Sequence, residues 1–227
     1  TPVVAGPESL ADYAGLPENE QHYFGCISAM DEQIGHLRST LKNLGVDENT
    51  LTFFTSDNGP ENQKGRPRSL GITKGLSERK RSLKEGGIRV PGLVTLPGRW
   101  PGGQTVDMPF STSDYLPTIL ELTGISYPDD RPLDGKSMLP WLAEDTNRPA
   151  PPLFFDYQGQ LAIIDGQYKL YKSGADASFE LYDLTADPAE LEDQSGGNPN
   201  IKAKLVDACQ SWQTSVARSL EGADYQN

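Results

Sequence analysis

Apolar residues recur at alternating intervals of four and three between residues 23 and 44, the spacing of one face of an α-helix. The members of this series are Tyr23, Ile27, Met30, Ile34, Leu37, Leu41 and Leu44. Gly45 follows where a C-cap glycine normally lies, so the helix is expected to end there. A second series near the C-terminus has intervals of three and four and predicts another amphipathic helix. It comprises Ile201, Leu205, Ala208, Trp212 and Val216.

Short apolar runs bounded by turn residues predict the strands. Residues 51–54 follow the first helix and have the composition of a buried strand, and a second buried strand is expected between Pro91 and Pro97. A helix followed by a buried strand is typical of an α/β layer with a largely parallel sheet. Residues 111–123 predict a further helix that ends at Gly124.

The pattern changes after residues 144–152, whose sequence EDTNRPAPP is that of a linker. Strands are predicted near residues 153–157, 161–164, 168–172 and 179–184, and Asp165-Gly166 is a strong hairpin signal. We therefore predict two domains. Residues 1–147 form an α/β domain, and residues 148–227 form a small antiparallel β-sheet with a C-terminal helix.

Charge and composition exclude several classes of protein. The formal net charge of −12 argues against a nucleic-acid-binding surface. No run approaches the roughly 18 apolar residues that a membrane span needs. Cys26 and Cys209 lie on separate predicted helices and are expected to be free thiols, with no base nearby to make either a nucleophile. His22 and His36 fall outside the apolar series of the first helix and are predicted to be exposed.

Two oxygen-bearing side chains, Asp57 and Asn58, follow the strand predicted at residues 51–54. In open α/β sheets, ligands bind at the carboxyl ends of the strands. A carboxylate and an amide suit Ca²⁺ or Mg²⁺ better than zinc. Asp-Asn-Gly is also a good turn sequence, and two oxygens cannot fill a site that needs six or more. The residues alone leave both a turn and part of a metal site open.

Residues 60–87 carry a local excess of positive charge in this acidic chain, followed by the triplet Glu85-Gly86-Gly87. Its cations are Lys64, Arg66, Arg68, Lys74, Arg79, Lys80, Arg81 and Lys84. A solvated loop is one interpretation, and a positive lining for an anion such as sulfate or phosphate is the other. The paired glycines are expected to permit close backbone approach or a positive φ, which is a structural role.

Several segments, in this order and spacing, resemble the type I sulfatases of the alkaline phosphatase superfamily. They are YFGCISAMDEQIGHLRSTLKNLGVDENTLTFFTSDNG, RKRSLKEGGIRVPGLVTLPGRWPGG, STSDYLPTILELTGI, DGKSMLPWL and FELYDLTADPAELED. The resemblance covers most of this chain but only the C-terminal half of that family. It implies that residues 1–147 are the C-terminal part of an alkaline-phosphatase-like, mixed-sheet α/β domain that is incomplete here.

The resemblance also implies roles for individual residues. The Asp-Asn of the family's S-D-N-G motif binds Ca²⁺, which assigns Asp57 and Asn58 as metal ligands in the full-length enzyme. With only these two ligands, Ca²⁺ binding to this chain alone is expected to be weak or absent. A lysine before the E-G-G-x-R motif contacts the substrate sulfate, and the alignment places it at Lys80, with Lys84 as the fallback. Arg89 of that motif is expected to be structural.

The family nucleophile, a formylglycine made from Cys or Ser in C/S-x-P-S-R, has no counterpart here. Ser126-Tyr127-Pro128 is the only S-x-P, and its following residues and its position after the S-D-N-G motif both disagree with the family pattern. We therefore expect the chain to be the C-terminal portion of a sulfatase, with no catalytic nucleophile and no hydrolysis of sulfate esters by itself.

Two alternatives stay open beside the enzyme portion. One is a non-catalytic binding or assembly module, which oligomerises through the surface left by the missing N-terminal part. The other is a phosphoesterase of the same superfamily, which Asn58 disfavours because the related phosphatases and phosphonate hydrolases tend to have His there. Bacterial relatives are often exported, so the resemblance implies a periplasmic or secreted protein. The particular sulfate ester cannot be read from the sequence.

Overall fold

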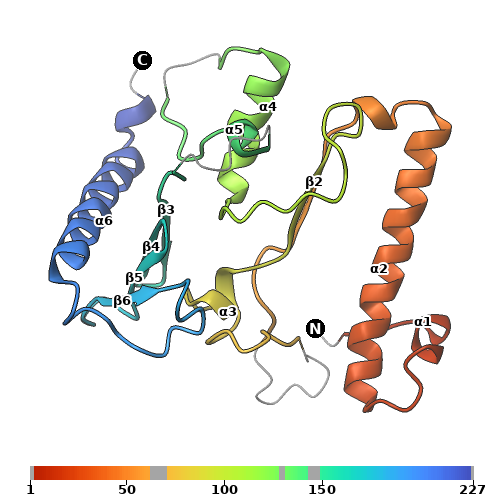
Figure 1. The fold of residues 1–227 in the computed structure, drawn as a ribbon, viewed down its shortest axis with the longest axis horizontal. Helices are drawn as coiled ribbons and strands as arrows, with labels where there is room; N and C mark the ends of the chain where they lie inside the picture. Colours follow the sequence, from red (N-terminus) through yellow and green to blue (C-terminus); the bar gives the residue numbers. More distant parts are fainter. Residues whose placement is uncertain (1–2, 62–70, 128–130, 143–148, 226–227) are drawn as a thin grey trace. The chain divides into compact units, whose positions relative to one another are not determined.

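The computed structural model describes residues 3–61, 71–127, 131–142 and 149–225 (Figure 1). The contacts within the chain divide it into two compact units, residues 1–103 and residues 104–227. The domain boundary predicted between residues 147 and 148 falls at the edge of residues 143–148, outside the described ranges, and stays a prediction.

Unit 1 begins with helices and ends with a strand pair. Its elements are α1 (Pro7–Ala11), α2 (Glu18–Asn43), the 3-10 turn η1 (Asp47–Asn49), β1 (Thr52–Thr55), α3 (Glu85–Ile88) and β2 (Gly92–Thr95). The long helix α2 ends as the sequence predicts. Gly45 has a φ of +68° and donates its N–H to the carbonyl of Lys42, while Val46 donates to Leu41 at 3.1 Å. These two bonds cap the last turn and leave the chain free to turn toward β1.

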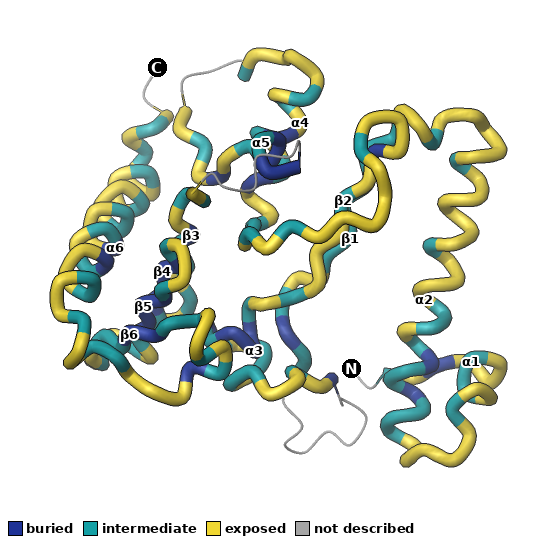
Figure 2. Tube along the Cα trace, viewed as in Figure 1, coloured by how far each residue is buried: buried dark blue, intermediate teal, exposed yellow. Residues whose placement is uncertain are grey.

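The buried residues of α2, His22 and Gly25, lie near its start. Ala5 donates its backbone N–H to Nδ1 of His22 at 3.2 Å, and a Cβ on Gly25 would lie 2.8 Å from the Cβ of Ala5. The prediction that His22 is exposed is therefore wrong, because the α1 segment folds over it. Farther along the helix, Met30 and Leu37 are 44% and 53% exposed. Figure 2 shows that much of α2 is exposed.

Strands β1 and β2 form an antiparallel pair, with Phe53 opposite Val94 and Phe54 opposite Leu93. The largely parallel sheet and the two buried strands expected from the sequence are not found in the described residues. All four residues of β1 are half-buried, and Leu93 in β2 is 63% exposed. The apolar β-forming run predicts a strand but carries no information on the direction of its partner.

Unit 2 contains a short helical region followed by a four-stranded sheet and a long helix. Its elements are η2 (Thr112–Asp114), α4 (Tyr115–Thr123), α5 (Leu139–Leu142), β3 (Leu153–Tyr157), β4 (Gln160–Asp165), β5 (Tyr168–Lys172), β6 (Glu180–Asp183), α6 (Pro199–Leu220) and η3 (Ala223–Tyr225). The sheet is antiparallel in the order β3-β4-β5-β6. The mixed α/β architecture with an antiparallel sheet and a C-terminal helix confirms the predicted fold class.

Helix α6 packs on one face of this sheet. Ile163, Leu170 and Leu181 occupy neighbouring register positions on three strands and are fully buried together with Leu205 of α6. Burial of apolar side chains of this size contributes about 1.5–3 kcal/mol each, so this cluster stabilises the sheet region substantially. Figure 2 shows the same concentration of buried residues along β4, β5 and β6.

The neighbouring position on β5 holds a buried ion pair instead of an apolar residue. Because successive side chains of a strand point to opposite faces, Lys169 faces away from the Leu170 cluster. Its Nζ lies 3.0 Å from Oε1 of Glu190, and both side chains are fully buried. Glu190 adopts a φ of +55° in the loop after β6, and the ion pair holds this loop against the sheet.

Candidate functional site

The Asp57-Asn58 pair forms a turn directly after β1, as its position in the sequence predicts. Ser56 Oγ donates to the carbonyl of Asn58 at 2.9 Å, and the Asn58 side-chain amide donates to the carbonyl of Gly59 at 2.9 Å. Asp57 is exposed and Asn58 is half-buried. Within the described ranges, no donor binds the carboxylate of Asp57 or Oδ1 of Asn58.

The glycine after this pair brings the turn against the Glu85-Gly86-Gly87 triplet. Gly59 donates its N–H to the carbonyl of Gly87 at 2.7 Å. A Cβ on Gly59 would overlap the carbonyl oxygen of Gly86. The triplet itself is packed as tightly, since a Cβ on Gly87 would overlap the carbonyl oxygen of Ser82. Three backbone segments therefore meet at a distance that only glycine allows, which is the structural role predicted for these residues.

Lys80 is joined to the same turn through its backbone. Its N–H donates to the carbonyl of Pro60 at 3.0 Å, two residues after Asn58. Lys84 instead precedes α3 and donates its backbone N–H to Ser82 Oγ at 3.1 Å. The structure thus brings together Asp57, Asn58 and Lys80, the three residues that the resemblance singled out, although they lie more than twenty residues apart in the sequence.

The arginines on either side of Lys80 are bound to the segment that follows the turn. Arg79 Nη1 donates to the carbonyl of Gly71 at 2.6 Å and to that of Glu61 at 3.4 Å. Arg81 forms a two-pronged ion pair with the Glu61 carboxylate, in which Nη2 lies 3.1 Å from Oε2. From the sequence, these arginines could be read only as positive charge. No signal in the sequence distinguishes them from their cationic neighbours, of which Lys64, Arg66 and Arg68 lie outside the described residues.

Glu85 and Arg89 form a second ion pair beside the site. Arg89 Nη1 lies 3.8 Å from Glu85 Oε2, and the side chain of Glu85 is buried. Arg89 also closes the short helix α3 by donating its backbone N–H to the carbonyl of Glu85. Both contacts agree with the structural role expected for Arg89.

A calcium ion fits the chemistry of Asp57 and Asn58 but not their number. Carboxylate and amide oxygens are hard ligands of the kind that Ca²⁺ prefers, and the ion takes six to eight of them. Across the described parts of the chain, no three His, Cys, Asp or Glu side chains gather in an arrangement that could hold a metal ion.

Neither cysteine has the setting of a nucleophile. Both are free thiols; Cys209 is buried in α6, and Cys26 is half-buried in α2. Burial raises the pKa of the Cys209 thiol, which disfavours the reactive thiolate. The helices of the described residues include none that is long and apolar enough to cross a membrane.

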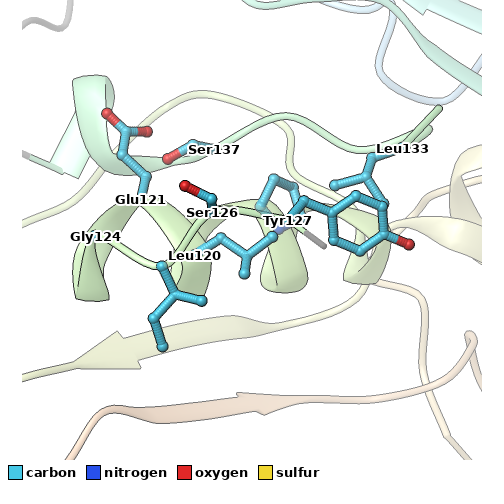
Figure 3. Close-up of a pocket in the computed structure, with 9 residues that line it drawn as sticks. Leu120, Glu121, Gly124, Ser126, Tyr127, Leu133 and Ser137 are labelled. Carbon is cyan, nitrogen blue, oxygen red and sulfur yellow. The ribbon is translucent and has the colours of Figure 1, made fainter. Parts of the chain in front are cut away.

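A pocket of about 540 Å³ lies in unit 2, beside the C-terminal half of α4 (Figure 3). Ser126 and Tyr127, which belong to the S-x-P sequence that does not fit the nucleophile motif, line this pocket. Figure 3 shows the oxygens of Glu121, Ser126 and Ser137 toward one end and the side chains of Tyr127 and Leu133 toward the other. Its lining includes none of the residues that the sequence analysis proposed as ligands.

Two known protein families match the sequence of this chain. The family described as Sulfatase matches residues 8–125, and the family described as N-sulphoglucosamine sulphohydrolase, C-terminal, matches residues 77–212. The first match contains the turn and Lys80, and the second contains Lys80 and most of unit 2. The chain therefore belongs to the sulfatase family and has the alkaline-phosphatase-like fold, as its motifs predict.

Individual relatives agree with this assignment. Steryl-sulfatase of Rattus norvegicus is 37% identical over 145 residues, which are 60% of this chain and 24% of that protein. N-acetylgalactosamine-6-sulfatase of Mus musculus is 32% identical over 149 residues, 66% of this chain and 28% of that protein. The chain thus spans about a quarter of the length of these relatives.

Solved structures resemble the chain over most of its length. The crystal structure of Ps i-CgsB matches with a TM-score of 0.80 at 27% sequence identity. The matched region is 93% of this chain and 47% of the Ps i-CgsB chain. The phosphonate monoester hydrolase of Agrobacterium radiobacter matches with a TM-score of 0.63 at 25% sequence identity. The matched region is 86% of this chain and 41% of the hydrolase chain. The shared fold therefore occurs in a protein whose name denotes a phosphonate ester as well as in sulfatases.

Proposed function

We propose that this chain contributes part of the active site of an enzyme that hydrolyses sulfate esters. Asp57 and Asn58 act as two ligands of a Ca²⁺ ion, and Lys80 contacts the sulfate group of the substrate. The observation that carries the proposal is the hydrogen bond from the Lys80 backbone N–H to the carbonyl of Pro60 at 3.0 Å, because it fixes the lysine beside the Asp57-Asn58 turn.

The chemistry of sulfate ester cleavage explains why these groups belong together. Negative charge grows on the departing oxygen and on the sulfate as the S–O bond breaks, and fixed positive charge lowers the energy of that state. A bound Ca²⁺ would supply Lewis-acid stabilisation of this charge. Lys80 offers a compact ammonium group, which suits the tetrahedral sulfate, and its backbone hydrogen bond to Pro60 fixes its main chain beside the turn.

We also propose that the chain by itself does not turn over sulfate esters, because its sequence has no C/S-x-P-S-R motif and it offers two metal ligands where six or more are needed. Export to the periplasm or outside the cell is part of the same proposal. A phosphoesterase with this fold is a second candidate, supported by the similarity to a phosphonate monoester hydrolase. The amide of Asn58 favours the sulfatase, since His at this place suits Mn²⁺ or Zn²⁺.

An assembly module is a third candidate, supported by the exposed apolar side chains on α2. Ile27, Met30 and Leu37 are 42%, 44% and 53% exposed and share one face of the helix. A second copy of the chain is the partner that we propose for this face, because two identical apolar stripes satisfy each other in a two-fold arrangement.

Calcium titration of the ¹⁵N-labelled chain, followed by NMR, tests the metal assignment. We expect the amide signals of residues 57–59 to shift, with millimolar affinity, and the shifts to vanish in Asp57→Ala. Asp12→Ala, which removes an exposed carboxylate just after α1, serves as the matched control and should leave them unchanged. Equal shifts over many acidic residues in all three proteins would contradict the assignment. Turnover of an aryl sulfate by the purified chain would contradict its proposed inactivity.

A further inference from the structure

Three consecutive cations, Arg79, Lys80 and Arg81, have unequal surroundings. Arg79 is bound by the carbonyls of Gly71 and Glu61, and Arg81 is bound by the Glu61 carboxylate. For the ammonium group of Lys80, the described residues provide no hydrogen-bond or ion-pair partner. One acidic residue, Glu61, therefore contacts both arginines, through its carbonyl in one case and its carboxylate in the other.

The contact with Arg81 changes the charge beside Lys80. A two-pronged pair between a guanidinium and a carboxylate is among the stronger polar contacts in proteins and has no net charge. Arg81 is 53% exposed at its side chain, whereas Glu61 is 23% exposed, so the pair neutralises a cation that would otherwise face solvent next to Lys80. Around Lys80, the Arg81-Glu61 part of the loop thus contributes no net positive charge.

The backbone indicates that this pair is maintained at a cost. Arg81 has a φ of +76°, in the left-handed region that residues with a Cβ rarely adopt and that glycine adopts freely. Glycine would relieve the strain but would remove the guanidinium. Arginine at this position therefore carries a backbone strain that glycine would avoid, and its ion pair with Glu61 compensates for that strain.

We propose that Glu61 is a specificity-determining residue that favours sulfate monoesters over phosphate monoesters, and this rests on the proposed role of Lys80. A sulfate monoester carries one negative charge, whereas a phosphate monoester carries nearly two above its second ionisation near pH 6. With Arg81 neutralised by Glu61, the positive charge on residues 79–81 is limited to Lys80 and the carbonyl-bound Arg79. An unpaired Arg81 would add attraction that the phosphate dianion feels about twice as strongly.

Binding of methyl sulfate and methyl phosphate to the full chain tests this proposal. Both are titrated at pH 8 and low ionic strength, where the phosphate ester is a dianion and screening is weak. The amide signals of Lys80 and its neighbours report binding. In Glu61→Gln we expect the affinity ratio of methyl phosphate to methyl sulfate to rise two- to five-fold, roughly the Coulomb effect of one exposed charge a few ångströms away.

Two further variants make the outcomes distinguishable. Lys80→Ala should abolish both titrations; if either ester binds equally well without Lys80, the proposed function fails. If binding depends on Lys80 but Glu61→Gln leaves the ratio unchanged, only the role of Glu61 is overturned. Arg81→Gln removes the cation and leaves the carboxylate, so it should shift the ratio in the opposite direction. That variant also decides the question if Glu61→Gln fails to fold, and an unchanged ratio in it would refute the proposal.

Discussion

Lys169 and Glu190 form an ion pair of 3.0 Å in which both side chains are completely buried. Two charges removed from water need each other, because a buried charge that loses its partner keeps the full cost of desolvation. This pair joins the centre of the antiparallel sheet to the loop that follows β6, at the position next to the Leu170 cluster. The stability of the sheet region therefore depends on a polar contact as well as on its apolar core.

We predict that Lys169→Met lowers the free energy of unfolding by about 3–5 kcal/mol, since it leaves Glu190 buried without its cation. The double variant Lys169→Met/Glu190→Leu should recover at least half of this loss, because it removes both charges. Urea denaturation followed by circular dichroism measures both values. A double variant that is less stable than the single one would show that the pair is not the origin of the effect.

The contact of Gly59 with Gly86 predicts a sharp difference between two Gly→Ala substitutions. Gly59→Ala should lower the free energy of unfolding by about 2–3 kcal/mol, because its Cβ would overlap the Gly86 carbonyl. Gly35→Ala is the matched control, since a Cβ there meets nothing within 4 Å and replaces glycine inside α2. It should raise stability by roughly 0.5–1 kcal/mol. Similar effects of the two substitutions on urea denaturation would refute the close approach.

Asp193 is expected to make unit 2 sensitive to acid. Although partial burial opposes it, hydrogen bonds from the backbone N–H groups of Leu181 and Ser195 lower the pKa of the Asp193 carboxyl below its ordinary value of 3.8. A lowered folded-state pKa means that the carboxylate stabilises the fold above about pH 4 and that this contribution is lost as the pH falls further.

The variant Asp193→Asn keeps an acceptor oxygen but cannot titrate. We expect the difference in urea midpoint between wild type and Asp193→Asn to be constant between pH 5 and 7 and to shrink below pH 4. Asp207→Asn, on the exposed face of α6, is the control and should show a smaller dependence. A difference between wild type and Asp193→Asn that does not vary with pH would rule out the linkage.

The exposed face of α2 predicts self-association. Sedimentation velocity of the wild-type chain should show a weight-average mass that rises with concentration, because Met30 and Leu37 expose apolar surface on one side of the helix. Leu37→Lys should abolish this rise by placing a charge in the stripe. Ser39→Lys places the same charge at an exposed position on the opposite face of α2 and should leave the rise intact. A concentration-independent monomer in the wild type would exclude the second copy as the partner.

Local patterns in the sequence predicted the elements well. The intervals of the apolar residues anticipated α2 and α6, Gly45 and Gly124 mark helix ends in the left-handed conformation, and Asp165-Gly166 lies at the turn between β4 and β5. These features depend on neighbours in the chain, so a local pattern contains them. The direction of β1 against β2 and the burial of His22 depend on distant segments, which explains why both were predicted wrongly.

In the candidate site, too, some features could be predicted from the sequence and others depend on distant segments. Asp57, Asn58 and Lys80 were proposed from motifs, and in the structure these motifs are joined by hydrogen bonds from Gly59 to Gly87 and from Lys80 to Pro60. The role proposed for Glu61 could not be predicted from the sequence. A single acidic residue near a run of cations has many partners available, and only the folded geometry selects Arg81.

The glycine contacts around Gly59 also bear on how this site can change over time. The side chain of Asp57 is exposed, so it can be exchanged without disturbing the packing around it. The backbone of the site is different, because any added carbon at Gly59, Gly86 or Gly87 collides with a neighbouring carbonyl. Substitution of these glycines is therefore excluded at the same site where an exposed side chain tolerates substitution.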